Sequence, residues 1–259
     1  MTPYRGLGNS FRQALHDRQP LYGCWLALAN TVSTEILGYA GFDWLLLDAE
    51  HSPNDLSSLH MQLLALKDSP SAPVVRPQWN DPVLLKRLLD LGFYNFLIPM
   101  VQTADEARRA VAATRYPPEG IRGVSASQRS NRYGEEPNYF KTINASICVM
   151  VQIETPEGIA NIGSIADVEG VDGVFIGPQD LAATYGHLLN PAHEEVQNAI
   201  RQATQAVLGK GKPVGTLAPA EADARRYLEM GMTFVATGTD QGLLKESARR
   251  LVASFTGPR

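Results

Sequence analysis

Eight short, continuously apolar runs limit the folds open to this chain more than any other feature of its sequence. A segment with helical periodicity follows each run. Strands that are covered by helices on both faces are apolar throughout, whereas half-exposed strands alternate apolar and polar residues. The pattern therefore predicts parallel strands joined by helices. The runs occupy residues 22–28, 43–49, 73–77, 95–100, 147–154, 173–178, 213–218 and 233–238.

The helical segments carry recognisable start and stop signals. In residues 80–92, Asn80 or Asp81 can cap the helix, Pro82 suits its first turn, and Gly92 suits its end. The other helical segments are residues 31–41, 54–68, 103–115, 155–170, 193–211, 219–231 and 240–255. Residues 116–138 carry no such pattern and are expected to form a long irregular loop.

Eight strand–helix units in 259 residues predict a single (β/α)₈ barrel domain over residues 1–259. A doubly wound sheet is the alternative fold. It usually has fewer strands and a GxGxxG turn after the first strand, where this chain has ANTVSTE. The barrel is therefore the preferred prediction.

Composition excludes several classes of function. The net charge is −4 and the basic residues are scattered, which argues against nucleic acid as a partner. No apolar run is long enough to span a membrane, and the first residues lack the apolar core of a signal peptide, so we expect a cytoplasmic protein. Cys24 and Cys148 lie in apolar runs, which predicts buried free thiols in a reducing compartment.

Polar side chains gather where the predicted strands end, and this is the edge at which barrel enzymes place their chemistry. The stretch LLLDAEH runs from an apolar strand directly into three ionisable groups. The residues at or just past predicted strand ends are Asp48, Glu50, His51, Arg76, Gln152, Glu154, Gln179 and Asp180. From the residues alone, His51 could equally be a surface histidine at a turn, and Arg76 could simply neutralise nearby carboxylates.

Glu154 and Asp180 are the best candidates for metal ligands. Gln152 and Glu154 are two residues apart, so both point into the barrel with Met150, while Val151 faces the helices. Because Asp180 follows the next strand, the two carboxylates can converge on Mg²⁺ or Mn²⁺. No CxxC, HxH or HExxH spacing indicates a zinc site, and no lysine lies at a strand's carboxyl end to form a Schiff base.

The segments LLLDAEH, VVRPQWNDP, GIRGVS, VQIETPEG and EGVDGVFIGPQDLAA resemble the HpcH/HpaI aldolase family, over roughly residues 5–255. The resemblance implies a barrel of the phosphoenolpyruvate/pyruvate type and a class II, metal-dependent pyruvate aldolase. VSASQRSNRYG and LAPAEADARRYLEMG are most similar to members that cleave 2-dehydro-3-deoxyglucarate into pyruvate and tartronate semialdehyde. The alternatives are cleavage of 4-hydroxy-2-oxoheptanedioate into pyruvate and succinate semialdehyde, and a non-catalytic barrel that binds a keto acid.

The resemblance also implies roles for the metal-binding and catalytic residues. Glu154 and Asp180 match the two ligands of a divalent cation, for which Mg²⁺ is preferred over Mn²⁺ or Co²⁺, with no organic cofactor. His51 matches the catalytic base, and Asp90 matches the carboxylate that increases its basicity. Arg76 matches the arginine placed against the keto oxygen.

The substrate-binding residues follow from the same resemblance. Gln152 matches an amide that contacts pyruvate, and Arg122 matches an arginine for the aldehyde partner, although Arg122 could also belong to a solvated loop. The backbone N–H of Gln179 can serve pyruvate, but the family usually has Ala or Ser at this position. Asp48 and Glu50 match polar groups near the waters of the metal.

The family commonly forms hexamers in which C-terminal helices exchange between subunits. The segment LLKESARRLVASF has an apolar stripe that suits such docking. We therefore expect a homo-oligomer, either a hexamer or a trimer, whose other partners are small keto acids.

Overall fold

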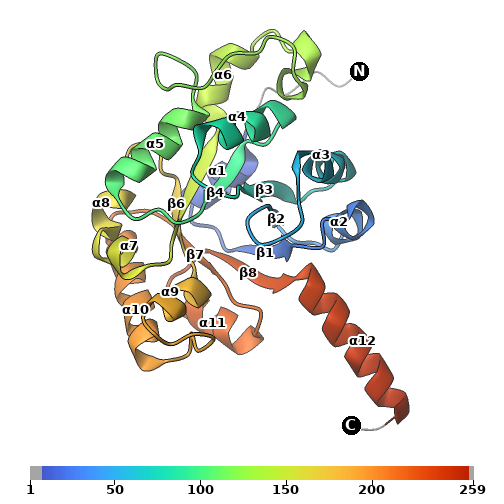
Figure 1. The fold of residues 1–259 in the computed structure, drawn as a ribbon, viewed down its shortest axis with the longest axis vertical. Coiled ribbons are helices and arrows are strands. Elements are labelled where there is room, and N and C mark those ends of the chain that lie inside the picture. The colour runs from blue at the N-terminus through green and yellow to red at the C-terminus, as the bar shows by residue number, and fades with distance from the viewer. Residues whose placement is uncertain (1–7, 257–259) are drawn as a thin grey trace.

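The structure is a computed structural model that describes residues 8–256. Its eight parallel strands pair in chain order, and β8 pairs with β1 to close a barrel (Figure 1). The predicted (β/α)₈ barrel is thereby confirmed, with a strand in each of the eight apolar runs. The strands are β1 Leu21–Leu26, β2 Trp44–Asp48, β3 Ala72–Arg76, β4 Asn95–Ile98, β5 Cys148–Ile153, β6 Gly173–Ile176, β7 Val214–Leu217 and β8 Phe234–Thr239.

Helices surround the barrel, and most form where their capping signals predict. In α4, Asp81 is the N-cap, Pro82 opens the first turn, and Gly92 ends the helix at a φ of 102°. The other predicted helices are α2 Thr31–Gly38, α3 Leu56–Ala65, α5 Ala104–Thr114, α10 Glu194–Gly209, α11 Glu221–Glu229 and α12 Asp240–Thr256.

The sequence did not predict four further elements, and one prediction was too long. The additional elements are α1 Ser10–His16, the 3₁₀ helix η1 Arg129–Gly134, α6 Tyr139–Ser146 and α9 Pro178–Thr184. Segments of six to eight residues are too short for a clear helical period. The single helix expected over residues 155–170 is instead two, α7 Pro156–Ala160 and α8 Ile162–Ala166, because Asn161 leaves helical geometry between them.

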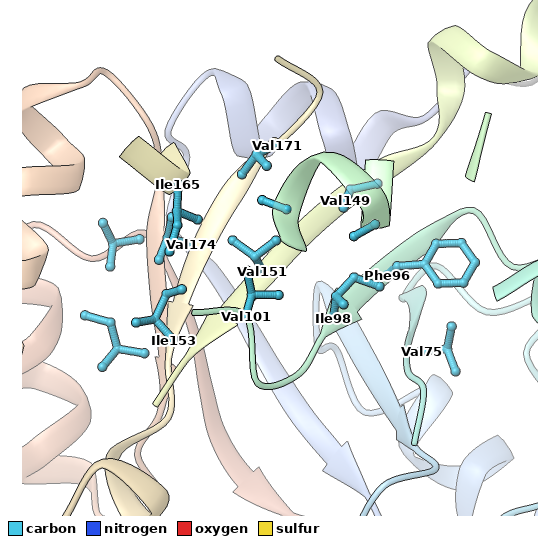
Figure 2. Packing of buried hydrophobic residues seen from close by; sticks show 14 of the residues in the cluster. Val75, Phe96, Ile98, Val101, Val149, Val151, Ile153, Ile165, Val171 and Val174 are labelled. Carbon is cyan, nitrogen blue, oxygen red and sulfur yellow. The ribbon is translucent and has the colours of Figure 1, made fainter. Parts of the chain in front are cut away.

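The core has two layers, one inside the barrel and one between the sheet and the helices. Val151 and Ile153 pack in the outer layer, part of which Figure 2 shows. Met150 belongs to the inner layer, together with Phe175 and Phe234. This division confirms the predicted alternation along β5. Each such fully buried side chain stabilises the fold by about 1.5–3 kcal/mol.

Helix α1 packs against the N-terminal ends of the strands. Its Phe11 belongs to the cluster that fills the barrel interior and contacts Trp44 at the start of β2. Asp172, just before β6, accepts a hydrogen bond from Arg12 at 2.9 Å and lies 2.7 Å from His16. Because α1 covers this end, the carboxyl ends of the strands form the face on which a site can open.

Two further predictions concern buried thiols and membranes. Cys24 and Cys148 are free and fully buried, as expected. Within residues 8–256, no helix combines the length and the apolar character that crossing a membrane requires.

Helix α12 extends away from the barrel after β8 (Figure 1). Asp240 is its only buried residue, and its carboxylate accepts hydrogen bonds from the backbone N–H groups of Ala27 and Leu28. This contact attaches the first turn of α12 to the end of β1. The rest of the helix exposes a row of large apolar side chains, which includes Leu244, Leu251 and Phe255. 

Candidate active site

A buried ion pair links the ends of β2 and β3. Asp48 and Arg76 are register partners in the sheet, and Arg76 donates from Nε and Nη2 to the two Asp48 oxygens at 2.8 and 2.7 Å. Burial disfavours both charges, but the hydrogen bonds and charge of Arg76 hold the pKa of Asp48 below its ordinary value. Asp48 in turn raises the pKa of Arg76. The pair therefore remains ionised inside the protein.

Trp25 on β1 supports this ion pair from the side. Its indole N–H donates to Asp48 Oδ2 at 3.3 Å, and its ring lies 5.0 Å from the guanidinium carbon of Arg76. Such a contact places a cation over an aromatic face. Trp25 thus holds both members of the pair in one orientation.

The turn after β2 brings a second carboxylate to Arg76. Glu50 lies 2.9 Å from Nη1 of Arg76, and its backbone N–H donates to Asp48 Oδ1. Burial, followed by the repulsion of Asp48 and Asp180, raises the pKa of Glu50 to about 7 despite the charge of Arg76. His51 lies at the rim with 63% of its side chain exposed, and its Nε2 is 4.0 Å from Glu50 Oε2.

Glu154, at the end of β5, is 2% exposed and is held in place by two hydrogen bonds. One comes from the backbone N–H of Met100 at 2.9 Å, and the other comes from Nε2 of Gln152 at 2.5 Å. Burial, with smaller contributions from the charges of Glu50 and Asp180, raises the pKa of Glu154 to about 7. Glu154 therefore lies close enough to two other carboxylates to be repelled by them.

Gly177 allows the Glu154 carboxylate to lie against the loop after β6. A Cβ atom at residue 177 would lie 2.6 Å from Oε2 of Glu154 and 3.0 Å from its Cβ. The backbone of Gly177 also donates to the carbonyl of Ile153 at 3.0 Å. Any larger residue at this position would push the carboxylate aside.

The residues present fit a divalent cation. Glu50, Glu154 and Asp180 lie near enough to one another at the strand ends for their charges to interact, and a cation would relieve that repulsion. In addition, Oε1 of Gln152 is buried and has no hydrogen-bond partner among the described residues. A buried acceptor of this kind calls for a ligand or a water. Carboxylate and amide oxygens are the donors that Mg²⁺ and Mn²⁺ prefer.

Comparison with known proteins agrees with this geometry. The family model described as HpcH/HpaI aldolase/citrate lyase matches residues 21–247. The chain belongs to this family. It is 58% identical over 247 residues to 5-keto-4-deoxy-D-glucarate aldolase of Citrobacter koseri, covering 95% of this chain and 96% of that protein. It is 57% identical, over the same shares, to the enzyme of that name from Klebsiella pneumoniae.

Solved structures extend the comparison to the fold. A family member from Burkholderia cenocepacia superimposes with a TM-score of 0.93 at 39% identity, over 95% of this chain and 98% of that one. CitE from Mycobacterium tuberculosis shares the fold at a TM-score of 0.57 and 17% identity, over 87% of this chain and 86% of that one. Its structure was solved in complex with magnesium and pyruvate. Both the predicted family membership and the predicted fold are therefore confirmed.

Two residues that the family resemblance assigned to the site lie elsewhere in a single chain. Helix α4 begins beyond the carboxyl end of β3 and ends before β4, so Asp90 lies toward the opposite end of the barrel from His51. Its carboxylate accepts a hydrogen bond from Arg122 at 2.9 Å. Arg122 is only 2% exposed and lies against the ring of Tyr116. Within one chain, neither residue is brought to the site.

Three residues in contact with the site were missed by sequence reasoning: Trp25, Met100 and Gly177. Trp25 is a single aromatic residue within an apolar strand, and the residues around it give no sign of a polar role. Met100 acts through its backbone N–H and has a φ of 53°, neither of which its side chain predicts. Gly177 had a signal, because a glycine between a strand and a helix indicates a close approach of neighbouring atoms.

Proposed function

We infer that this chain is a divalent-metal-dependent aldolase that cleaves 5-keto-4-deoxy-D-glucarate to pyruvate and tartronate semialdehyde. The observation that carries the proposal is the buried carboxylate of Glu154, which lies near the charges of Glu50, Asp180 and Arg76, in a chain 58% identical to an aldolase of that name. A six-carbon diacid can be numbered from either end. The 5-keto-4-deoxy compound therefore has the same carbon skeleton as the 2-dehydro-3-deoxyglucarate expected from the sequence.

Glu154 and Asp180 would hold the metal, which when bound acts as a Lewis acid on the keto-acid end of the substrate. Gln152, whose buried Oε1 has no hydrogen-bond partner within residues 8–256, orients the keto acid or a water beside Glu154. Arg76 places a fixed positive charge where negative charge develops on the keto oxygen. Because Asp48 and Trp25 already hold the guanidinium, little reorganisation is needed during the reaction.

His51 is the proposed base of the reaction. In the 2-keto-3-deoxy numbering, it removes the proton of the C4 hydroxyl, the C3–C4 bond breaks, and C4 becomes the aldehyde carbon of tartronate semialdehyde. The electron pair passes to C3, which then takes up a proton to give pyruvate. The imidazole of His51 is exposed at the rim, where a bound substrate can reach it and a ring nitrogen can accept the proton. Gln179, on the first turn of α9, lies at the mouth of the same face and is the proposed neighbour of pyruvate.

Pyruvate release tests the proposal directly. We expect kcat/KM for 5-keto-4-deoxy-D-glucarate to exceed that for 4-hydroxy-2-oxoheptanedioate by at least about tenfold, which corresponds to about 1.4 kcal/mol of transition-state binding. A chelator should abolish release with either substrate, and an added divalent metal should restore it. A tenfold preference for the heptanedioate would instead favour that aldolase. Failure with every metal and keto acid would favour a keto-acid-binding barrel.

Metal affinity should depend on pH through Glu154. A carboxyl pKa raised from 4.5 to about 7 means that the folded protein binds this proton more tightly than the unfolded chain does. The proton therefore stabilises the folded state fully below about pH 4.5, and this stabilisation is lost as the pH rises through 7. A metal needs the ionised form and competes with that proton. We expect the Kd for Mn²⁺, measured by calorimetry, to be roughly ten times larger at pH 6 than at pH 8. Glu50→Gln should shift this pH dependence to lower pH. An affinity for Mn²⁺ that does not change between pH 6 and pH 8 would contradict the assignment.

We also propose that α12 packs on a second copy of the chain. The exposed residues Leu244, Leu251 and Phe255 recur at helical spacing along α12. The barrel also exposes large apolar side chains, which include Tyr22 on β1 and Ile36 on α2. A helix that exposes this much apolar surface calls for a partner. An assembly of several copies is also the arrangement in which Asp90 of one chain can approach His51 of another.

Disrupting the apolar row of α12 should dissociate this assembly. We expect Leu244→Glu/Leu251→Glu to lower the mass measured by light scattering after size exclusion, because two buried charges would be left unpaired in the interface. Ala253→Glu adds the same charge on the opposite side of the helix and should leave the mass unchanged. A wild-type chain that is monomeric at micromolar concentration would refute the proposal.

A further inference from the structure

Two histidines and a glutamate cluster outside the site described above. His187 and His193 lie in the segment that joins α9 to α10, and Glu195 lies in the first turn of α10. Among residues 8–256, they form the one group of three metal-ligating side chains whose donor atoms lie within 4.8 Å of one another. The proposed reaction makes no use of them.

The three side chains contact one another directly. Nε2 of His187 lies 2.8 Å from Oε2 of Glu195. The two imidazole rings stack with their centroids 3.4 Å apart and their planes 17° apart. The backbone N–H of Glu195 donates to Nδ1 of His193 at 3.3 Å, so that nitrogen carries a lone pair. Two imidazoles and a carboxylate therefore share one small volume.

Backbone turns hold the cluster together. The N–H of His187 donates to the carbonyl of Ala182 at 2.8 Å, which attaches the segment to α9. The N–H of Asn190 donates to His187, and the N–H of His193 donates to Asn190. These turns reverse the chain between the two histidines, so that the rings meet without help from any distant element.

We propose that His187, His193 and Glu195 form a second metal site, which takes a transition metal such as Zn²⁺ and is separate from the Glu154–Asp180 pair. Two imidazole nitrogens and a carboxylate oxygen are a donor set of zinc sites, whereas Mg²⁺ prefers oxygen alone. Ligand distances of about 2.0–2.1 Å place the donors of a tetrahedral site roughly 3.3 Å apart. The donor atoms lie within 4.8 Å of one another and would reach this spacing as the two rings turn out of their stack.

The surroundings allow an ion to enter. The side chain of Glu195 is 56% exposed and that of His187 is 24% exposed. A surface pocket that Tyr185 and Asn198 help to line opens beside His193. A bound ion would join the segment after α9 to the first turn of α10. Because Asp180 lies on α9, the ion would also restrain the helix that carries it.

Metal stoichiometry tests this site apart from the proposed catalytic one. The untagged, full-length Glu154→Gln/Asp180→Asn variant is stripped with a chelator and dialysed against Zn²⁺. We expect one Zn²⁺ per chain, with a rise in Tm that Mg²⁺ does not cause. With Co²⁺ as the probe, the visible spectrum of a four-coordinate ion should appear.

Further substitutions in the same background identify the ligands. His187→Gln/His193→Asn removes both imidazoles while asparagine keeps the helix cap, and it should weaken Zn²⁺ binding at least about a hundredfold. Glu195→Gln should weaken binding at least about tenfold, whereas Glu194→Gln, on the same turn, should leave it unchanged. No bound Zn²⁺ in the background variant would overturn the proposal. Equal Zn²⁺ affinities of the Glu194→Gln and Glu195→Gln variants would also overturn it, since both residues are exposed and neither substitution should disturb the fold.

Discussion

Glu154→Gln is expected to lower kcat/KM for pyruvate release at least about a thousandfold, a loss of about 4 kcal/mol of transition-state stabilisation. Glutamine has the shape of glutamate but not its charge. The site would therefore lose one of its two proposed metal ligands while the side chain still fits beside Gly177. Steady-state kinetics at saturating Mg²⁺ or Mn²⁺, together with calorimetric titration of the metal, measures the effect.

The stability of this variant separates a role in metal binding from a role in folding. Burial raises the pKa of Glu154 to about 7, so the ionised carboxylate is unfavourable in the metal-free protein. We expect the Tm of metal-free Glu154→Gln at pH 8 to equal or exceed that of the wild type. Glu157→Gln, on the exposed surface of α7, is the matched control and should change neither kcat/KM nor Tm. More than a tenth of wild-type activity in Glu154→Gln would rule out Glu154 as an essential ligand.

Arg76→Met is expected to lower the free energy of unfolding by about 3–5 kcal/mol, because it leaves a buried carboxylate without its partner. Asp48 is only 2% exposed and receives two hydrogen bonds from Arg76. For a chain of this length the loss corresponds to a fall in Tm of roughly 10 °C. Activity should fall as well, since the fixed positive charge near the keto oxygen disappears. Urea denaturation and kinetics measure the two effects.

Two comparisons distinguish this result from a general effect of removing arginine. Arg108→Met removes a surface ion pair with Asp105 and should cost less than about 1 kcal/mol. Asp48→Asn/Arg76→Met removes both buried charges and should recover part of the stability without recovering activity. Equal destabilisation by Arg76→Met and Arg108→Met would show that the Asp48–Arg76 pair does not stabilise the fold.

Most of the fold could be predicted from local patterns. A strand covered on both faces is apolar along its whole length, so each of the eight runs identified a strand within a few residues. Capping residues located helices such as α4, in which Asp81 and Gly92 mark the two ends. The short helices α1, α6 and α9 escaped detection because seven or eight residues give too little periodicity.

Part of the site could also be predicted, where strand geometry alone determines direction. Alternation along β5 places Gln152 and Glu154 on the inner side, and the two side chains are hydrogen-bonded there. Sequence reasoning also placed Asp48 and Arg76 at the ends of neighbouring strands, and the structure shows that they pair there. The roles of Asp90 and Arg122 came only from family resemblance, and the single chain places them away from His51.

Local periodicity and the alternation of strands were enough to predict the closed barrel, the order of its elements, and the face on which ionisable residues gather. The folded structure was needed to show which charges pair, which backbone N–H reaches Glu154, where α12 extends, and how the turns between His187 and His193 bring the two rings together. Those outcomes depend on distances between residues far apart in the chain, or on backbone angles that no residue type specifies. Local sequence patterns carry no record of such distances.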